Sequence, residues 1–377
     1  MYGLKESAMN WFKTVETELK KLGCQQSILD PSVFTYRNNC NELLGIFVCH
    51  VDDFLFSIGS ESFNNNIISK IKQAYAISSE NSGDFTYVGL KIEENENGIS
   101  ISQPEFAKTV QTVSINGLKL KRDDKLDKKL KREYQSLLGQ LGWLAHQTRP
   151  DLSFNTFTCS LFQVEPSFGN LKDLNKIVGM VQNGPTHIQL SRLDRSSLKI
   201  VCFSDASFAN VLPDKIYSGE GILIFLADNS GKCALVNWKA RKITRVVHST
   251  QSAECLSLVE AIGDACYARS LLEETLFNNP RSKTIPIEVY VDSSQLFKAI
   301  GSTHMITDKL RRLNIAELKQ LIHPESEKIS LYWIPTDLML SDCLTKIGAS
   351  REKLSQVMMT GTLNQNELTE RRACLKM

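Results

Sequence analysis

The sequence predicts an α/β protein of the α+β kind, in which mixed sheets are flanked by helices. Apolar runs at 198–203, 285–291 and 329–334 have the length and composition of buried strands. Between the first two runs, apolar residues recur at helical spacing from Leu258 to Leu272. With 377 residues, 42% hydrophobic and 23% charged, the chain is long enough to bury more than one core.

Acidic residues stand at the ends of these predicted elements. Asp205 follows the strand at 198–203, where the apolar run gives way to polar residues, so its carboxylate lies at a strand mouth. Glu254 lies at the start of the predicted helix, which the hydroxyls of Ser249 and Thr250 can cap. The other two acids are Asp292, which ends the strand at 285–291, and Asp342, which follows the last strand after Pro335.

Taken singly, each of these acids is most simply a solvated surface residue. As a set, they lie in turn at the end of a strand, at the start of a helix, at the end of a second strand and after the last strand. Grouped carboxylates ionise together only when a metal neutralises them, and such carboxylates can bridge two divalent cations. We therefore expect a site for two Mg²⁺ ions about 4 Å apart, with Mn²⁺ as the alternative metal.

Four short motifs contain the four acids, and a fifth, Val236-Asn-Trp238-Lys239, precedes the motif of Glu254. The four with an acid are Ser204-Asp205-Ala-Ser, Ser249-Thr-Gln-Ser-Ala-Glu254, Val291-Asp292-Ser and Ser341-Asp342-Cys-Leu-Thr-Lys346. In combination, the five motifs make the segment from about Leu198 to Lys346 resemble the ribonuclease H domain of Ty1/copia-type retrotransposon Pol polyproteins. The resemblance implies that Asp205, Glu254 and Asp292 bind metal and act in catalysis, with Asp342 as the fourth such residue.

The same resemblance implies a reaction and a partner. The reaction is hydrolysis of the RNA strand of an RNA/DNA hybrid, and the partner is that hybrid. We expect the RNA strand to be selected through its 2′-hydroxyl groups and through the shape of the hybrid rather than through base edges.

A second group of motifs lies in the first third of the chain. It comprises Tyr2-Gly-Leu-Lys-Glu-Ser7, Asp30-Pro31-Ser-Val-Phe34 and His50-Val51-Asp52-Asp53, the last between apolar runs at 43–48 and 54–58. These motifs resemble the middle of a copia-type reverse transcriptase. An Asp pair at the tip of a hairpin is how a polymerase palm holds its metals, so Asp52 and Asp53 form a partial polymerase site. The competing interpretation is a turn that uses Asp for its turn chemistry.

Two departures from the family pattern affect this first third. His50 stands where the family usually has Tyr. The chain also begins inside the polymerase domain, so we expect the fingers and the strand that bears the first catalytic Asp to be missing. RNA-directed DNA polymerase activity is therefore not expected from this polypeptide alone.

The resemblance implies four regions along the chain. They are a truncated reverse-transcriptase palm at 1–118, a helical thumb and connection at 119–196, a ribonuclease H-like mixed-sheet domain at 197–348 and a C-terminal tail at 349–377. The runs at 84–92 and 98–103, around the turn from Glu94 to Gly98, are expected to be paired strands between palm and thumb.

Basic residues gather in two places, although a net charge of +2 does not by itself indicate a nucleic-acid-binding protein. The first cluster, from Lys119 to Arg132, is interleaved with acids, and both phosphate binding and a solvated face fit it. The second cluster has few acids near it in the sequence and precedes Glu254, so we expect it to contact phosphates. Its members are Lys239, Arg241, Lys242 and Arg245.

The remaining signals concern the compartment and one histidine. The ten cysteines form no C-x-x-C pair and no apolar run is long enough to cross a bilayer, so we expect free thiols, an intracellular protein of cytoplasm or nucleus, and no membrane partner. The first residues lack the features of a signal peptide. His304 lies in a loop from which a histidine can assist proton transfer, but we expect it to be incidental.

Two other interpretations stay open. One is a relic or co-opted domain that holds hybrid or structured RNA without cutting it. The other is that Met1 is an artefact of gene prediction and that the product is a longer, active reverse-transcriptase polyprotein, whose other segments are then partners. An open reading frame upstream of Met1 that encodes an Asp-bearing palm strand would favour this last interpretation.

Overall fold

The computed structural model describes residues 6–117, 119–209, 211, 217–302, 309–323 and 328–375. Its contacts divide the chain into two compact units. Unit 1 comprises residues 1–88 and 266–285, and unit 2 comprises residues 89–265 and 286–377. Across the described ranges, no helix has both the length and the apolar character needed to cross a membrane.

Unit 1 is built on an antiparallel sheet with the strand order β1-β2-β3-β4. Its strands are β1 (Gln25–Gln26), β2 (Val33–Arg37), β3 (Leu43–His50), β4 (Asp53–Ile58) and, outside this sheet, β5 (Phe85–Tyr87). Its helices are α1 (Ser7–Lys21), α2 (Glu61–Phe63), a π-helical turn (Asn64–Ile68) and α3 (Ser69–Ala74). Alternate residues of β3 point into the core, where Phe47 and Cys49 pack with Phe34.

The hairpin predicted around the Asp pair is confirmed in unit 1. His50 pairs with Asp53, which leaves Val51 and Asp52 as a two-residue turn. Val51 has a φ of 52°, a conformation that β-branched residues rarely adopt. The indole Nε1 of Trp11 donates a hydrogen bond to the Val51 carbonyl oxygen at 2.6 Å, which holds this turn. Both aspartates are exposed, and their part in polymerase chemistry stays a prediction.

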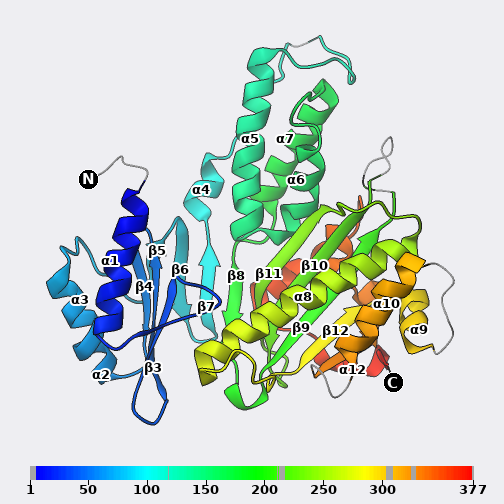
Figure 1. The fold of residues 1–377 in the computed structure, drawn as a ribbon. Coiled ribbons are helices and arrows are strands. Elements are labelled where there is room, and N and C mark those ends of the chain that lie inside the picture. The colour runs from blue at the N-terminus through cyan, green and yellow to red at the C-terminus, as the bar shows by residue number, and fades with distance from the viewer. Residues whose placement is uncertain are drawn as a thin grey trace. The chain divides into compact units, whose positions relative to one another are not determined.

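The first part of unit 2 contains three antiparallel strands and a helical bundle (Figure 1). The elements are β6 (Leu90–Asn95), β7 (Gly98–Ser102), α4 (Pro104–Thr109), α5 (Lys128–Gln147), η2 (Pro150–Leu152), α6 (Ser153–Ser160), α7 (Phe168–Asn183) and β8 (Ile188–Ser191). Asp127 caps α5 by accepting a hydrogen bond from the Leu130 amide at 2.8 Å. The helices bury one shared core, which includes Leu141 and Leu174. The paired strands and the helical region expected here are confirmed.

The rest of unit 2 is organised by a six-stranded sheet with the order β11-β10-β9-β12-β13-β14. Its strands are β9 (Lys199–Ser207), β10 (Gly219–Ala227), β11 (Cys233–Lys242), β12 (Ile287–Val291), β13 (Ile329–Trp333) and β14 (Ala373–Cys374). The strands β9, β12 and β13 run parallel, whereas β10, β11 and β14 pair antiparallel with their neighbours. The predicted mixed sheet is therefore confirmed.

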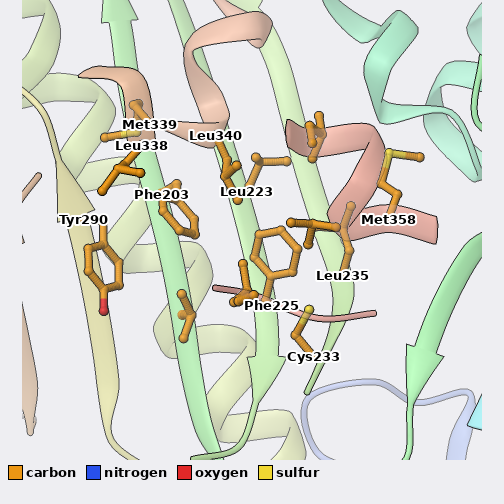
Figure 2. Packing of buried hydrophobic residues seen from close by; sticks show 14 of the residues in the cluster. Phe203, Leu223, Phe225, Cys233, Leu235, Tyr290, Leu338, Met339, Leu340 and Met358 are labelled. Atoms are coloured by element: carbon orange, nitrogen blue, oxygen red, sulfur yellow. The ribbon is translucent and has the colours of Figure 1, made fainter. Parts of the chain in front are cut away.

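Helices cover both faces of this sheet. On one face, α8 (Thr250–Phe277) lies across the strands, and the thiol of Cys202 contacts the carbonyl oxygen of Ala261 (Figure 1). On the other face, Phe203 stacks on Tyr290, with 5.1 Å between the ring centroids (Figure 2). The remaining elements are η3 (Arg195–Ser197), α9 (Ser294–Gly301), α10 (Lys309–Ile322), η4 (Thr336–Leu338), η5 (Leu340–Leu344), α11 (Glu352–Thr360) and α12 (Gln365–Arg371).

The segment expected as a C-terminal tail is part of this fold. Leu354 and Met358 of α11 and Leu368 of α12 lie in the same core as Phe203 (Figure 2 labels Met358). The strand β14 then pairs with β13 at the edge of the sheet. The segment has few apolar residues, and they are spread among charged ones, so no clear apolar pattern predicts that it packs on the sheet.

Candidate metal centre

Two neighbouring parallel strands carry Asp205 and Asp292. Phe203 of β9 pairs with Tyr290 of β12, and the same register continued by two residues brings Asp292 beside Asp205. Because side chains alternate along a strand, Asp205 shares a face with Phe203, and Asp292 shares a face with Tyr290. Both carboxylates therefore lie on the face opposite α8, at the carboxyl end of the parallel strands.

The helix α8 brings Glu254 to the same end of the sheet. The hydroxyl of Ser249 accepts a hydrogen bond from the Ser252 amide at 3.2 Å, so Ser249 caps the helix as expected. One turn after Glu254, the hydroxyl of Ser257 donates to the carbonyl oxygen of Asp205 at 3.0 Å. The Glu254 carboxylate accepts a hydrogen bond from the backbone amide of Ala206. These contacts fix the start of α8 against the end of β9.

The turn η5 contains Asp342, and Thr345 and Lys346 come directly after this turn. The backbone amides of Thr345 and Lys346 both donate to the carbonyl oxygen of Asp342, at 3.1 and 3.2 Å, so the chain folds back on itself. This turn directs the Thr345 hydroxyl to Oδ2 of Asp205, to which it donates a hydrogen bond. The Lys346 ammonium group pairs with Asp342 and lies 3.7 Å from Oδ2 of Asp205.

Three of the four predicted acids converge closely. One carboxylate oxygen from each of Asp205, Asp292 and Asp342 lies within 4.8 Å of the others, and the described residues contain no further cluster of three or more such ligands. Glu254 is not in this closest group, but it is 6% exposed, and its carboxylate interacts electrostatically with Asp205 and Asp292. Asp205 is 1% exposed, and the other two aspartates are half-buried.

Burial and crowding make this cluster hard to ionise without a cation. Burial raises the pKa of Asp205, and the Asp292 carboxylate raises it further, while the Lys346 ammonium group opposes both. Burial also raises the pKa of Glu254, and the charges of Asp205 and Asp292 add to that rise. A bound cation would remove the electrostatic cost of ionising these side chains.

The donor set fits a hard divalent cation. Oδ1 of Asp205 is buried and has no hydrogen-bond partner, so a buried oxygen remains free for a ligand. Mg²⁺ binds carboxylate oxygens at about 2.1 Å, so two oxygens about 4.2 Å apart can share one ion. The spacing of the three aspartates therefore needs an adjustment of less than about 1 Å to hold such an ion. Thr336 donates to Oδ2 of Asp292 at 2.8 Å and fixes the orientation of that carboxylate.

The predicted phosphate-binding cluster has a different environment from the one expected. Acids distant in the sequence reach it: Lys239 pairs with Glu260 at 3.0 Å and with Asp264 at 2.6 Å. Arg241 pairs with Glu220 and, at 2.7 Å, with Glu260. The expectation that few acids oppose this cluster is therefore wrong, because α8 and β10 supply them.

The other two members of the basic cluster are placed differently. The Lys242 ammonium group lies over the ring of Tyr217, 3.7 Å from its centroid. Arg245 is exposed. Phosphate contact by Lys239, Arg241, Lys242 and Arg245 stays a prediction. His304 lies outside the described residues.

Sequence reasoning assigned no role to several residues that shape the site. They are Thr345 and Lys346 on the turn, Ser257 on α8, Thr336 beside Asp292 and Gly221 beside Asp205. The signal for two of them was present, because Thr345 and Lys346 end the motif that starts at Ser341. Ser257, Thr336 and Gly221 become recognisable only once the strands and the helix are placed.

Comparisons with known proteins agree with these features. No family model matches the chain. The Retrovirus-related Pol polyprotein from transposon RE1 of Arabidopsis thaliana is 23% identical over 364 residues, which cover 92% of this chain and 23% of that protein. The Gag-Pol polyprotein of transposon Ty1-DR6 of Saccharomyces cerevisiae is 23% identical over 385 residues, which cover 92% of this chain and 20% of that protein. Over most of its length, the chain is similar to Pol polyproteins of Ty1/copia-type transposons.

Two further findings define the extent of this relationship. The putative transposon Ty5-1 protein of Saccharomyces cerevisiae is 26% identical over 260 residues, covering 66% of this chain and 81% of that protein. The chain spans about a quarter of the length of the RE1 and RE2 polyproteins that it matches.

A solved structure shares the fold. The foamy viral protease-reverse transcriptase in complex with an RNA/DNA hybrid matches 93% of this chain and 40% of that chain, with a TM-score of 0.51 and 14% identity. This likeness concerns the fold alone, and it agrees with the α/β architecture predicted from the sequence.

Proposed function

We propose that this protein hydrolyses the RNA strand of RNA/DNA hybrids in a divalent-metal-dependent reaction at the site formed by Asp205, Glu254, Asp292 and Asp342. The observation that carries the proposal is the convergence of Asp205, Asp292 and Asp342 from three separate segments, with their ligand oxygens within 4.8 Å of one another. The unpartnered Oδ1 of the buried Asp205 supports the same assignment. The homologous Pol polyproteins and the hybrid-bound structure that shares the fold support the choice of substrate.

Each acid has a distinct position in this proposal. Asp205, held by Thr345 and buried, offers its free oxygen as the central ligand. Asp292, oriented by Thr336, and Asp342, within η5, would offer the flanking oxygens. The Glu254 carboxylate adds a fourth negative charge from α8, on the other face of the sheet. The four carboxylates would hold two Mg²⁺ ions, or Mn²⁺ in their place, and these ions would lower the pKa of the attacking water and stabilise the leaving 3′ oxygen.

The hybrid is held, in this proposal, through its phosphates. Arg245 is exposed and Lys242 lies close to it in sequence, so these two residues offer positive charge to a backbone. Lys239 and Arg241 both pair with Glu260 of α8, so they help to fix the position of that helix. Their positive charges also attract the phosphates of the hybrid.

A cleavage assay tests the proposal. The full chain is incubated with Mg²⁺ and an RNA/DNA hybrid labelled on the RNA strand, beside Asp205→Asn, Glu254→Gln and Asp292→Asn. The parent protein should cleave the RNA strand, and each variant should lose about two to four orders of magnitude in rate. Glu352→Gln, an exposed acid on α11, serves as the matched control and should keep full activity. Equal activity in the parent and Asp205→Asn would refute the assignment.

A second candidate is a protein that binds hybrid or structured RNA without cutting it. The observation that favours it is the ammonium group of Lys346, which lies against two of the carboxylates. The same assay separates the two functions, because this candidate predicts retained binding of the hybrid with no cleavage by the parent protein.

The hairpin of Asp52 and Asp53 supports a more limited proposal. Its geometry fits a partial polymerase site. We propose reverse-transcriptase activity only for a longer product that includes the other polymerase elements. A primer-extension assay on this chain alone should give no product, whereas extension would show that its own residues complete a polymerase site.

A further inference from the structure

Lys346 occupies an unusual position for a basic residue. Its ammonium group pairs with Oδ1 of Asp342 and lies 3.7 Å from Oδ2 of Asp205. These two aspartates also belong to the group whose oxygens lie close enough to hold a cation. The positive charge of the lysine is therefore at the edge of the proposed metal site and not on a remote surface.

The turn η5 holds the lysine there through the backbone. Lys346 is four residues after Asp342, and its amide donates to the Asp342 carbonyl oxygen at 3.2 Å. Thr345 beside it is fully buried and anchors the turn to Asp205. The Lys346 side chain remains 38% exposed, so the ammonium group has a route to solvent.

The lysine and a metal ion compete for the same carboxylates. An oxygen that binds Mg²⁺ at about 2.1 Å gives up most of its attraction for an ammonium group, since two cations held by the same carboxylates repel each other. Burial acts to lower the pKa of Lys346, but the charges of Asp205 and Asp342 outweigh it and raise that pKa, so the side chain stays charged.

We propose that Lys346 is a tethered cation that neutralises the carboxylate cluster when metal is absent, and that binding of a divalent ion displaces its ammonium group towards solvent. The inference rests on the proposed function, because it takes the four acids as the metal site. In this account Lys346 is a positioning residue. Its charge stabilises the folded protein when metal is absent. Its displacement costs free energy, and this cost weakens metal binding.

Metal affinity is the first measurement. Lys346→Met keeps the aliphatic stem of the side chain and removes only the charge. It should lower the Kd for Mn²⁺, measured by calorimetry near pH 8, by about tenfold. The metal-free variant should also melt at a lower temperature than the metal-free parent, because the cluster loses its counter-ion. Lys353→Met removes the same charge from an exposed lysine of α11 and should change neither value.

Amine labelling is the second measurement, and it needs no variant. The parent protein is treated with an acetylating reagent, and the rate of modification of each lysine is read by peptide mass spectrometry. Saturating Mn²⁺ should speed the modification of Lys346 by about threefold or more, because the released amine is no longer ion-paired. The rate for Lys353 should not change.

The outcomes separate this inference from the proposed function. The inference is overturned if Mn²⁺ binds while the labelling of Lys346 stays constant or slows, if Lys346→Met binds Mn²⁺ no more tightly than the parent, or if neither protein binds Mn²⁺. Release of Lys346 by Mn²⁺ in a protein that does not cleave hybrids would instead support the inference and refute the nuclease assignment.

Discussion

Gly221 and Thr345 lie so close that a side chain on the glycine would strike the threonine. A Cβ built at Gly221 lies 2.7 Å from Cγ2 of Thr345 and 2.9 Å from the carbonyl oxygen of Ser341. Gly221 pairs with Asp205 across β10 and β9, so the absent side chain lets the turn η5 approach the acidic strand. The hydrogen bond from the Thr345 hydroxyl to the Asp205 carboxylate depends on that close approach.

Gly221→Ala should therefore push the turn away from the sheet. We expect a loss of about 1–3 kcal/mol in the free energy of unfolding, measured by chemical denaturation, because the turn has backbone as well as side-chain atoms in the way. Mn²⁺ affinity should fall by about tenfold, because Thr345 and Asp342 move with the turn. The control is Gly263→Ala on α8, where nothing lies within 4 Å and the substitution should stabilise by about 0.5–1 kcal/mol. Equal effects at the two glycines would contradict the close approach.

Thr345→Val tests the hydrogen bond itself. The two side chains have nearly the same shape, so the change removes the hydroxyl that holds Oδ2 of Asp205 and leaves a buried carboxylate oxygen without that donor. We expect Mn²⁺ affinity and hybrid cleavage to fall by about 10- to 100-fold, as is typical when the residue that orients a metal ligand is lost. Thr345→Ser, which keeps the hydroxyl, should recover most of the loss. Similar losses in the two variants would assign the effect to packing.

The pH dependence of metal stabilisation follows from the buried acids. Burial and neighbouring charge raise the pKa of Asp205 to about 7 and that of Glu254 to about 9, above their ordinary values. A raised carboxyl pKa means that the folded state binds more protons than the unfolded state. The metal-free protein should therefore lose stability as the pH rises from the ordinary carboxyl pKa values through the raised ones. A metal ion binds the ionised form, so its stabilising effect should grow with pH.

Thermal melts with and without Mg²⁺ measure this effect. The increase in Tm caused by Mg²⁺ should be larger near pH 8.5 than near pH 6. Glu254→Gln removes one of the buried carboxyl groups with a raised pKa, so the metal-free Tm of this variant should fall less over the same interval. A Mg²⁺ effect that shrinks as the pH rises would show that the raised carboxyl pKa values do not govern binding.

Two adjacent methionines test the role of the C-terminal segment. Met358 is 1% exposed and packs in the core beside the sheet, whereas Met359 is 41% exposed. Met358→Ala should lower the free energy of unfolding by about 2–4 kcal/mol, because it opens a cavity under α11. Met359→Ala should stay within about 0.5 kcal/mol of the parent. If denaturant melts give the same small change for both, α11 is not a structural part of the sheet.

Local patterns were sufficient to predict most elements that carry the acids. The strands before Asp205 and Asp292 are continuous apolar runs, and the helix of Glu254 shows a regular apolar face, so each could be identified from neighbouring residues alone. The hairpin around Asp52 was equally clear, because two apolar runs flank a short polar turn.

Interactions between distant segments could not be predicted in the same way. Few acids lie near the basic cluster in the sequence, but Lys239 pairs with Glu260 and Asp264 of α8, and Arg241 pairs with Glu220 of the adjacent strand. Pairing register decides these contacts, and register depends on the whole sheet. For the same reason, the role of Gly221 could not be predicted, because it follows from the approach of η5 to β9.

The central claim is that Asp205, Asp292 and Asp342 bind a divalent cation together. Crystals of the protein grown or soaked with Mn²⁺ and measured for anomalous scattering test it most directly. We predict an anomalous peak about 2.2 Å from Oδ1 of Asp205, in contact with Asp292 or Asp342, that disappears in Asp205→Asn. A fully soaked crystal with no peak among these oxygens, or with a peak that persists in Asp205→Asn, would contradict the account.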